Sequence, residues 1–262
     1  LKAFLNMHGI HDVVQRDLAI ELLDDLCTWE KTKPLYERII RELNEMSAKP
    51  RLTQEEAEKF NKLREAEEIV MALKDQIDSA VASQRSQEFY EIDQYMENLK
   101  IMDVWLDNIL APYYPSQLTV IGSQMRFSPY SSQEVIDSFT HPEENFFYDL
   151  YQQWYLPGIL EEDIDILGIS ITSVEQIISG LTLAYLVKQH RPEIHITVGG
   201  SVFTKLVDRL ESQGSHLFNF VDSFVVHEGE TPLLRLVEQL RGDGDLSKVP
   251  NLIYKQDGQV KV

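Results

Sequence analysis

Residues 163–201 read DIDILGISITSVEQIISGLTLAYLVKQHRPEIHITVGGS, and this stretch decides the fold. Its two apolar runs, within 164–171 and 194–198, flank a segment that has helical spacing. The runs are continuous rather than alternating, which is typical of parallel strands covered on both faces. A parallel pair needs a long crossover, and the intervening helix supplies it. The stretch therefore predicts two buried parallel strands joined by a helix.

The downstream sequence continues this alternation of helices and strands. Ser173 followed by Gln176 predicts the cap of the crossover helix, which should run to about His190. Thr231 followed by Pro232 predicts a cap and first helical position for a later helix that ends near Arg241. The remaining expected elements are a helix over 202–212, a strand over 223–226 and a hairpin of 251–254 with 260–262.

The first residues predict a helix over 1–9 that stops at Gly9, followed by a short strand over 12–17. An α/β domain usually opens on a strand. We therefore expect either that a first strand lies upstream of Leu1 or that another segment replaces it.

The middle of the chain has a different pattern. Residues 18–111 are rich in Glu, Lys, Gln, Ala and Leu, and predict three or four helices that form a lid or side bundle. Thr53 with Glu56 forms a capping box at the start of a long helix, and a further helix is expected over 87–110. The sequence then predicts a short strand, a loop and two helices, over 118–121, 122–132, 132–139 and 142–156. The aromatic residues of 146–155 indicate packing or, alternatively, a platform beside a flat ligand.

Composition limits the classes of function. The formal charge of −19 argues against a nucleic-acid partner, because such surfaces are usually basic. The single cysteine, Cys27, excludes an internal disulfide and a cysteine-based metal cluster, and it favours a reducing, cytoplasmic location. No apolar run approaches the roughly 20 residues that a membrane-spanning helix needs, and no signal peptide is seen, so no membrane partner is expected.

Candidate binding residues follow three successive strands. Ligands of open parallel sheets bind outside the carboxyl ends of the strands, where hydroxyls, glycines and helix N-termini can receive polar groups. The histidines show no metal-ligand spacing, and His227 is interpreted as a solvent-facing loop residue, so no catalytic or metal-binding residue is assigned. The predicted cofactor-binding residues are Ser170, Thr172, Ser173, Gly199, Gly200, Ser201, Glu228, Gly229 and Glu230.

These motifs resemble the cobalamin-binding domain of B12-dependent radical SAM enzymes. LGISITS, VGGS and VVHEGETPLLRLVEQL occur in the family's order, PNLIYKQDGQV resembles its closing hairpin, and LKAFLNMHGI resembles its first helix. The resemblance covers 1–20 and 160–262 and does not extend over the helical middle. Two family motifs are absent: Asp-x-His-x-x-Gly, whose His coordinates cobalt, and the Cys-x3-Cys-x2-Cys of the radical SAM barrel.

The resemblance implies a flavodoxin-like α/β fold with a parallel sheet and a large all-helical insertion. It implies that Ser170 and Thr172 line the channel of the nucleotide tail, that Gly199 and Gly200 leave room for it, and that the Glu228–Glu230 turn closes the far side. The implied partners are a corrinoid and a catalytic radical SAM barrel. S-adenosylmethionine and a 4Fe-4S cluster would belong to that barrel, and the whole enzyme would be of the methyltransferase type.

The expected organisation is a B12-binding domain over 1–17 and 160–248, a helical insertion or lid over 18–159, and a hairpin linker over 249–262. On this interpretation the chain itself is a non-catalytic part of an enzyme. Two alternatives stay open. A receiver-like signalling domain has a similar topology, but it needs an acidic residue where Ser170-Ile-Thr172 stands. In the second alternative, the helical middle is the functional part of the chain and acts as a protein-interaction scaffold without a cofactor.

Overall fold

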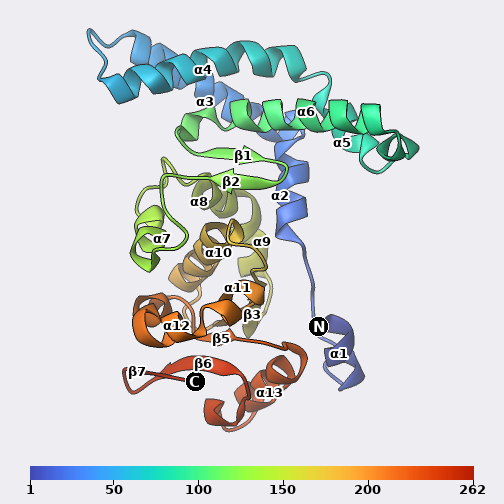
Figure 1. Ribbon diagram of the computed structural model, residues 1–262, viewed down its shortest axis with the longest axis vertical. Coiled ribbons are helices and arrows are strands. Elements are labelled where there is room, and N and C mark those ends of the chain that lie inside the picture. The colour runs from blue at the N-terminus through green and yellow to red at the C-terminus, as the bar shows by residue number, and fades with distance from the viewer. The chain divides into compact units, whose positions relative to one another are not determined.

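The computed structural model describes residues 1–262, apart from the side chain of Gln213, and shows an α/β protein built of two compact units (Figure 1). The sheet unit consists of Leu1–Gln15, Phe127–Pro142 and Phe147–Val262. The helical unit consists of Arg16–Arg126 and Glu143–Phe146.

The sheet unit holds a five-stranded sheet in the order β3-β4-β5-β6-β7. Its strands are β3 (Ile166–Ser170), β4 (His195–Gly199), β5 (Ser223–Val225), β6 (Leu252–Gln256) and β7 (Gln259–Lys261). Its α-helices are α1 (Lys2–Met7), α7 (Ser132–Phe139), α9 (Leu156–Glu161), α10 (Gln176–His190), α11 (Ser201–Lys205), α12 (Val207–Gln213) and α13 (Glu230–Arg241). Short 3-10 turns, η4 (Gly214–Asn219) and η5 (Leu246–Lys248), complete the connections.

The sheet is mixed: three of its strands have the predicted parallel arrangement, and the strands of the C-terminal hairpin add to it in the antiparallel direction. β3, β4 and β5 are parallel, whereas β6 pairs antiparallel with β5, and β7 pairs antiparallel with β6. Asp257 and Gly258 form the two-residue turn between β6 and β7, and both have positive φ angles, of 52° and 77°. Such turns match the twist of antiparallel strands. The predicted hairpin is therefore confirmed, and it forms one edge of the sheet.

β3 forms the other edge, and it is less buried than its apolar sequence predicts. Gly168 and Ser170 are exposed, whereas the interior residues of β4 are buried. The His195 amide donates to the Asp165 carbonyl, and the Ile171 amide donates to the Gly199 carbonyl. The backbone N–H and C=O groups of alternate residues point toward the same neighbouring strand. Asp165 and Ile171 bond to β4, so Gly168 and Ser170 point their backbone groups away from it. An edge position, which periodicity does not reveal, explains the wrong prediction of full burial.

Helices cover both faces of the sheet. Ile166 of β3 packs beside a cluster of α1 and α13 residues that includes Leu5 and Leu234. Ile171 contacts α10 closely, because a Cβ on Gly180 would lie 2.6 Å from its Cδ1 atom. Ile166 and Ile171 have opposite parity along the chain, so their side chains leave opposite faces. This two-sided cover is the arrangement that the continuous apolar runs predict.

Several element boundaries differ from the sequence prediction. The strand expected over 12–17 does not form, and this segment is an irregular connection between α1 and α2. α10 begins at Gln176, because the Gln176 Oε1 atom accepts the amides of Thr172 and Ser173 ahead of the helix. The helix expected over 202–212 is two helices, α11 and α12, which Leu206 separates.

α13 begins at Glu230, with Gly229 rather than Thr231 as its N-cap. Pro232 therefore occupies the third helical position. The amides of a helix's first turn have no helical partner, so a proline is tolerated there. The sequence located this helix correctly and placed its start two residues late.

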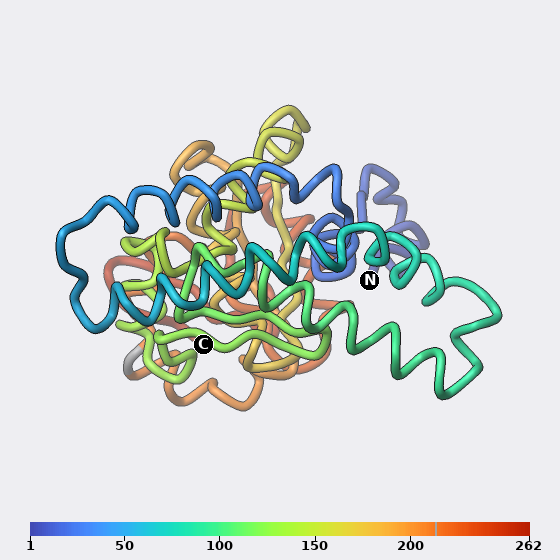
Figure 2. Tube along the Cα trace, turned by 90° about the horizontal axis from the view of Figure 1, so that it is seen from above, coloured from blue at the N-terminus to red at the C-terminus, as the bar shows by residue number. Residues whose placement is uncertain are grey.

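The helical unit contains the long helices that its composition predicts. They are α2 (Leu18–Leu26), α3 (Trp29–Ser47), α4 (Gln54–Leu73), α5 (Ile77–Ser83) and α6 (Ile92–Ile109), with the 3-10 turns η1 (Gln87–Tyr90) and η2 (Ala111–Tyr113) and a β1 (Gln117–Thr119) to β2 (Gly122–Gln124) hairpin. Figure 2 shows α3 and α4 as neighbouring helices that run in opposite directions. The capping box of α4 is confirmed, with Thr53 Oγ1 accepting from the Glu56 amide and the Glu56 side chain accepting from the Thr53 amide.

The aromatic stretch around 146–155 forms α8 (Phe146–Leu150) followed by a π-helical turn, η3 (Tyr151–Tyr155). Four of its six aromatic side chains are buried: Phe146, Phe147, Tyr151 and Tyr155. Burial raises the pKa of the Tyr151 phenol. The packing interpretation of this cluster is therefore supported.

A polar chain crosses the sheet at the end opposite to the candidate binding residues. The His195 Nε2 atom lies 2.9 Å from Ser223 Oγ, and Ser223 Oγ donates to Thr197 Oγ1 over 3.0 Å. Burial lowers the pKa of His195; the nearby Asp222 carboxylate opposes this effect, and the Lys188 ammonium reinforces it. Lys188 and Asp222 are themselves ion-paired at 2.7 Å. The fold therefore favours the neutral imidazole.

The ordinary pKa of histidine is 6.5, and the pKa of His195 in the folded protein is lower. We expect the free energy of unfolding to fall as the pH is lowered from above 6.5 towards the pKa of the folded protein. In that window the unfolded chain binds a proton that the folded chain does not yet accept. Urea unfolding between pH 7.5 and 5.5 measures the effect. The His195→Gln variant keeps a donor for Ser223, and its stability should depend less on pH. An identical pH dependence in the two proteins would show that His195 does not titrate as inferred.

Candidate functional site

The carboxyl ends of β3, β4 and β5 meet at one edge of the sheet because the three strands are parallel and adjacent. The structure thus brings together the three groups of residues that the sequence predicts as a binding site. We define the strand-end site as the nine predicted residues together with His227, which precedes the third group: Ser170, Thr172, Ser173, Gly199, Gly200, Ser201, His227, Glu228, Gly229 and Glu230.

Hydrogen bonds join the first two strand ends. Ser201 Oγ donates to the Thr172 carbonyl over 2.9 Å. Thr172 Oγ1 donates to Gln176 Oε1, which also accepts the Thr172 amide. The pKa of Glu175 is lowered mainly by a hydrogen bond from its own backbone amide and, to a smaller extent, by the Ser173 hydroxyl. Ser170 is exposed, and its hydroxyl has no hydrogen bond within the described residues. Of the predicted hydroxyls, that of Ser170 is thus the one left for a ligand.

Thr204 joins the second strand end to the third. Its Oγ1 atom accepts the backbone amide of His227 over 2.8 Å and lies 3.4 Å from the Gly200 carbonyl, to which it donates. His227 has a φ angle of 60°, in the left-handed region that few non-glycine residues adopt. Strained residues of this kind cluster at functional sites. Sequence reasoning missed Thr204 because no local pattern indicates a hydrogen bond to a residue 23 positions away.

Two of the three glycines of the site, Gly199 and Gly200, lie close to the backbone of a neighbouring strand end. A Cβ on Gly200 would lie 2.1 Å from the Ile171 carbonyl oxygen, and Gly200 has a φ angle of 120°. A Cβ on Gly199 would lie 3.3 Å from the Val225 carbonyl oxygen. The strand backbones therefore account for both glycines, whether or not a ligand lies nearby.

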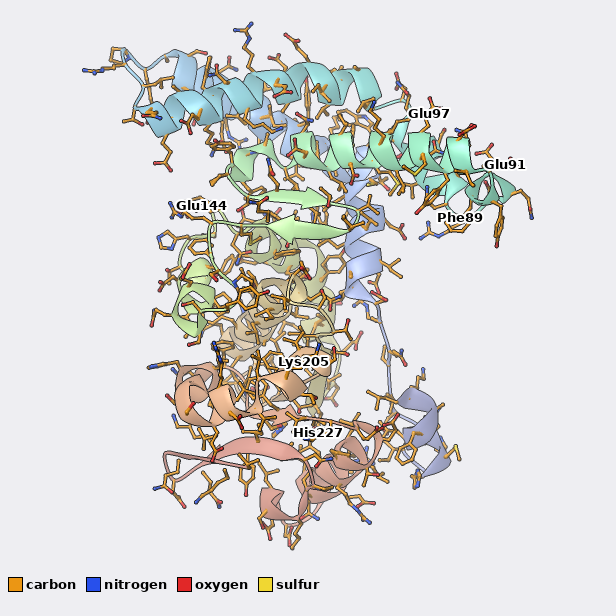
Figure 3. All side chains as sticks on the ribbon, viewed as in Figure 1. Phe89, Glu91, Glu97, Glu144, Lys205 and His227 are labelled. Carbon is orange, nitrogen blue, oxygen red and sulfur yellow. The ribbon has the colours of Figure 1, made fainter. Side chains whose placement is uncertain are left out.

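The third strand end is acidic, and a lysine follows Thr204. Glu228 and Glu230 are exposed, and Gly229 caps α13. Glu230 occupies the first turn of this helix, where the helix dipole favours a carboxylate. Lys205 is exposed on α11, and Figure 3 labels it together with His227. The strand-end site thus presents two carboxylates, the imidazole of His227 and the unpaired hydroxyl of Ser170 to solvent, and Lys205 is an exposed cation on the helix that follows β4.

The strand-end site offers hydrogen-bonding and charged groups. Ser170, its exposed hydroxyl, has no histidine or carboxylate bonded to it. Across the described residues, no group of three or more His, Cys, Asp or Glu side chains is placed to hold a metal ion.

Replacing His227 with glycine should raise the free energy of unfolding by about 1 kcal/mol, because glycine adopts a positive φ without strain. The Thr204 hydrogen bond uses the backbone amide and is retained. Thermal unfolding measures the change. Gly244→Ala is the reverse control, since Gly244 has a φ of 75° and no neighbouring atom lies within 4 Å of its ideal Cβ. This variant should lower the free energy of unfolding by about 1 kcal/mol. A destabilised His227→Gly protein would argue against strain at this position.

Comparison with known proteins gives no match: no family model, no curated protein and no solved structure is similar to this chain. Among the described residues, no helix combines the length and the apolar character needed to cross a bilayer.

Proposed function

We propose that the strand-end site binds cobalamin or a related corrinoid, and that the sheet unit is a flavodoxin-like carrier of this cofactor. The observation that carries the proposal is the joining of three consecutive parallel strand ends, through Ser201 with Thr172 and through Thr204 with His227, beside polar groups that face solvent. Crevices outside such ends are where open α/β sheets bind ligands. The sequence motifs that resemble B12-binding domains fall at these same ends.

The residues present fit the polar parts of a corrinoid. Ser170 offers a hydroxyl without an internal partner, and Lys205 offers a positive charge for the phosphate of the nucleotide tail. The first-turn amides of α13 at Glu230 and Thr231 have no helical partner, so they can donate to an anion or an amide oxygen. On this proposal, Gly199 and Gly200 fix the approach of the strands, and the ligand lies against them rather than in space that they vacate.

When bound, the corrinoid would supply cobalt chemistry, such as methyl transfer. The roles proposed for this chain are to bind the cofactor, to orient it and to exclude water from its tail. A radical SAM barrel that carries S-adenosylmethionine and a 4Fe-4S cluster is the catalytic partner we propose. The helical unit is proposed as an insertion that covers the cofactor or meets that partner.

A bulky residue at the strand-end site tests the proposal. We expect Ser170→Trp to weaken hydroxocobalamin binding about tenfold or more, which corresponds to about 1.4 kcal/mol, because the indole would occupy the place of the tail. Ser170 is exposed, so the fold should tolerate the change. Ser215→Trp is the matched control, since Ser215 is an exposed serine of the same unit in η4. Equilibrium dialysis measures both affinities, and equal binding by the two variants would place the ligand elsewhere.

A further inference from the structure

A cluster of apolar side chains is exposed in the helical unit where α5 leads into α6. Phe89 is 42% exposed, Tyr90 75%, Ile92 77% and Met96 58%. All four lie within eight consecutive residues, and we call them the tip cluster. Single exposed apolar residues are ordinary, whereas a contiguous exposed group usually marks an interaction site.

The tip cluster is held in place by an ordered scaffold. Asn98 Nδ2 donates to Ser83 Oγ over 2.6 Å, and Ser83 Oγ donates to the Ala80 carbonyl; the side chains of Asn98 and Ser83 are both buried. The hydrogen bond between Asn98 and Ser83 fixes α5 against α6. Ser86 Oγ caps η1 by accepting the Glu88 amide. The Phe89 ring makes edge contacts with Tyr90 and Tyr95, at centroid distances of 5.3 and 5.2 Å. A rigid display of this kind lowers the entropy cost of binding.

A hollow lies beside the cluster. It has a volume of about 480 Å³ and is lined by residues 84–87, Phe89 and Tyr90. The hollow can thus take one side chain of a partner beside the Phe89 and Tyr90 rings.

The rim of the tip cluster is acidic. Glu88, Glu91, Asp93 and Glu97 are all exposed, and none forms an ion pair within the described residues. Figure 3 labels Phe89, Glu91 and Glu97 together on this part of the chain. The nearby cation Arg85 is already paired with Asp24. The rim therefore carries an unneutralised negative charge around an apolar centre.

We propose that the tip cluster docks a basic amphipathic segment of a partner protein, with the apolar face of that segment on the tip cluster and its Lys or Arg side chains on the rim. Complementary charge supports this choice, since it steers partners together and sets their register. An anionic membrane surface and nucleic acid would both be repelled by the four carboxylates. A second copy of this chain would present the same acidic rim to itself, and the chain has a net charge of −19.

A synthetic helical peptide of leucine and lysine, labelled with a fluorophore, is the probe, and binding is read by anisotropy with the full chain. We expect the double variant Tyr90→Ser/Ile92→Ser to weaken binding about tenfold or more. Ile121→Ser is the matched control, because Ile121 is 94% exposed and lies outside the cluster. Its affinity should equal that of the unaltered chain.

Charge reversal separates docking at the rim from general attraction to an acidic protein. Glu91→Lys/Glu97→Lys should weaken binding more than Glu65→Lys/Glu68→Lys, which changes the net charge equally on exposed residues of α4. A peptide with glutamate in place of lysine should not bind. The proposal is overturned if the two charge variants bind alike, if the tip variants bind as tightly as Ile121→Ser, or if phosphatidylserine vesicles bind while the peptide does not. Self-association of the chain through the cluster, seen by sedimentation velocity, would overturn it as well.

Discussion

Replacing Gly200 with alanine should destabilise the sheet unit by about 3 kcal/mol or more, from backbone strain together with the loss of strand contacts. The new Cβ would lie 2.1, 2.7 and 3.0 Å from the carbonyl oxygen, carbonyl carbon and nitrogen of Ile171. These are backbone atoms, which cannot rotate away as a flexible side chain would. The end of β3 would have to leave β4, and the hydrogen bond from the Ile171 amide to the Gly199 carbonyl would break.

Two glycine controls divide this effect into its parts. Gly258 has a φ of 77° and no atom within 4 Å of its ideal Cβ, so Gly258→Ala reports the cost of the angle alone, about 1 kcal/mol. Gly168 lacks a positive φ, and its Cβ would meet only Thr197 Cγ2 at 3.8 Å, so Gly168→Ala should change stability by less than about 0.5 kcal/mol. Hydrogen exchange of the peptides that contain β3 and β4 measures all three variants. A Gly200→Ala protein as stable as Gly258→Ala would contradict the close approach of the strands.

Replacing Trp105 with alanine should destabilise the helical unit by about 3 to 5 kcal/mol, the usual range for deleting a buried aromatic side chain. Trp105 lies in α6 and has no exposed surface. Its ring meets the Trp29 ring edge-on at a centroid distance of 6.3 Å. Its Nε1 atom donates to the Leu26 carbonyl over 2.7 Å. Leu26 is the last residue of α2, so its carbonyl has no helical partner and the indole satisfies it.

Cys27 provides the measurement for this variant, because it is the single cysteine of the chain and it is buried next to Leu26. Burial, with smaller contributions from Asp24 and Asp103, raises the pKa of its thiol to about 12, so the folded protein should react slowly with thiol reagents. Trp105→Ala should accelerate the reaction by about 100-fold or more, as the loss in stability implies. Trp105→Phe keeps most of the packing and leaves the Leu26 carbonyl unpaired. Its rate of thiol labelling should therefore lie between those of the unaltered chain and Trp105→Ala. Slow labelling of Trp105→Ala would contradict the assigned role.

The sequence predicts the parts of this fold that depend on local pattern. The α4 capping box, the hairpin of 251–254 with 260–262, and the strands within 164–171 and 194–198 each depend on neighbouring residues, and all are confirmed. The prediction of a strand over 12–17 was wrong, because the sequence could not show whether a neighbouring strand was available to pair with it. The exposure of β3 was missed for a related reason, since strand order decides which apolar run lies at an edge.

The grouping of the candidate residues at one edge of the sheet could be predicted from the sequence, whereas the contacts among them could not. Parallel strand ends share an edge by geometry, so Ser170, Gly199 and Glu228 could be grouped from the sequence alone. The positive φ of His227 and its hydrogen bond to Thr204 depend on tertiary contacts. Likewise, the glycine requirement at Gly200 follows from the position of Ile171, 29 residues earlier, and no composition or spacing reveals it.

Reconstitution with hydroxocobalamin tests the central proposal most directly. The unaltered chain is incubated with excess corrinoid, passed through a desalting column and scanned between 300 and 600 nm. We predict that the visible corrinoid bands elute with the protein in a ratio near one, and that Ser170→Trp loses them while Ser215→Trp keeps them. A colourless protein fraction from the unaltered, folded chain, with all of the corrinoid in the small-molecule volume, would contradict a cobalamin site at the strand ends.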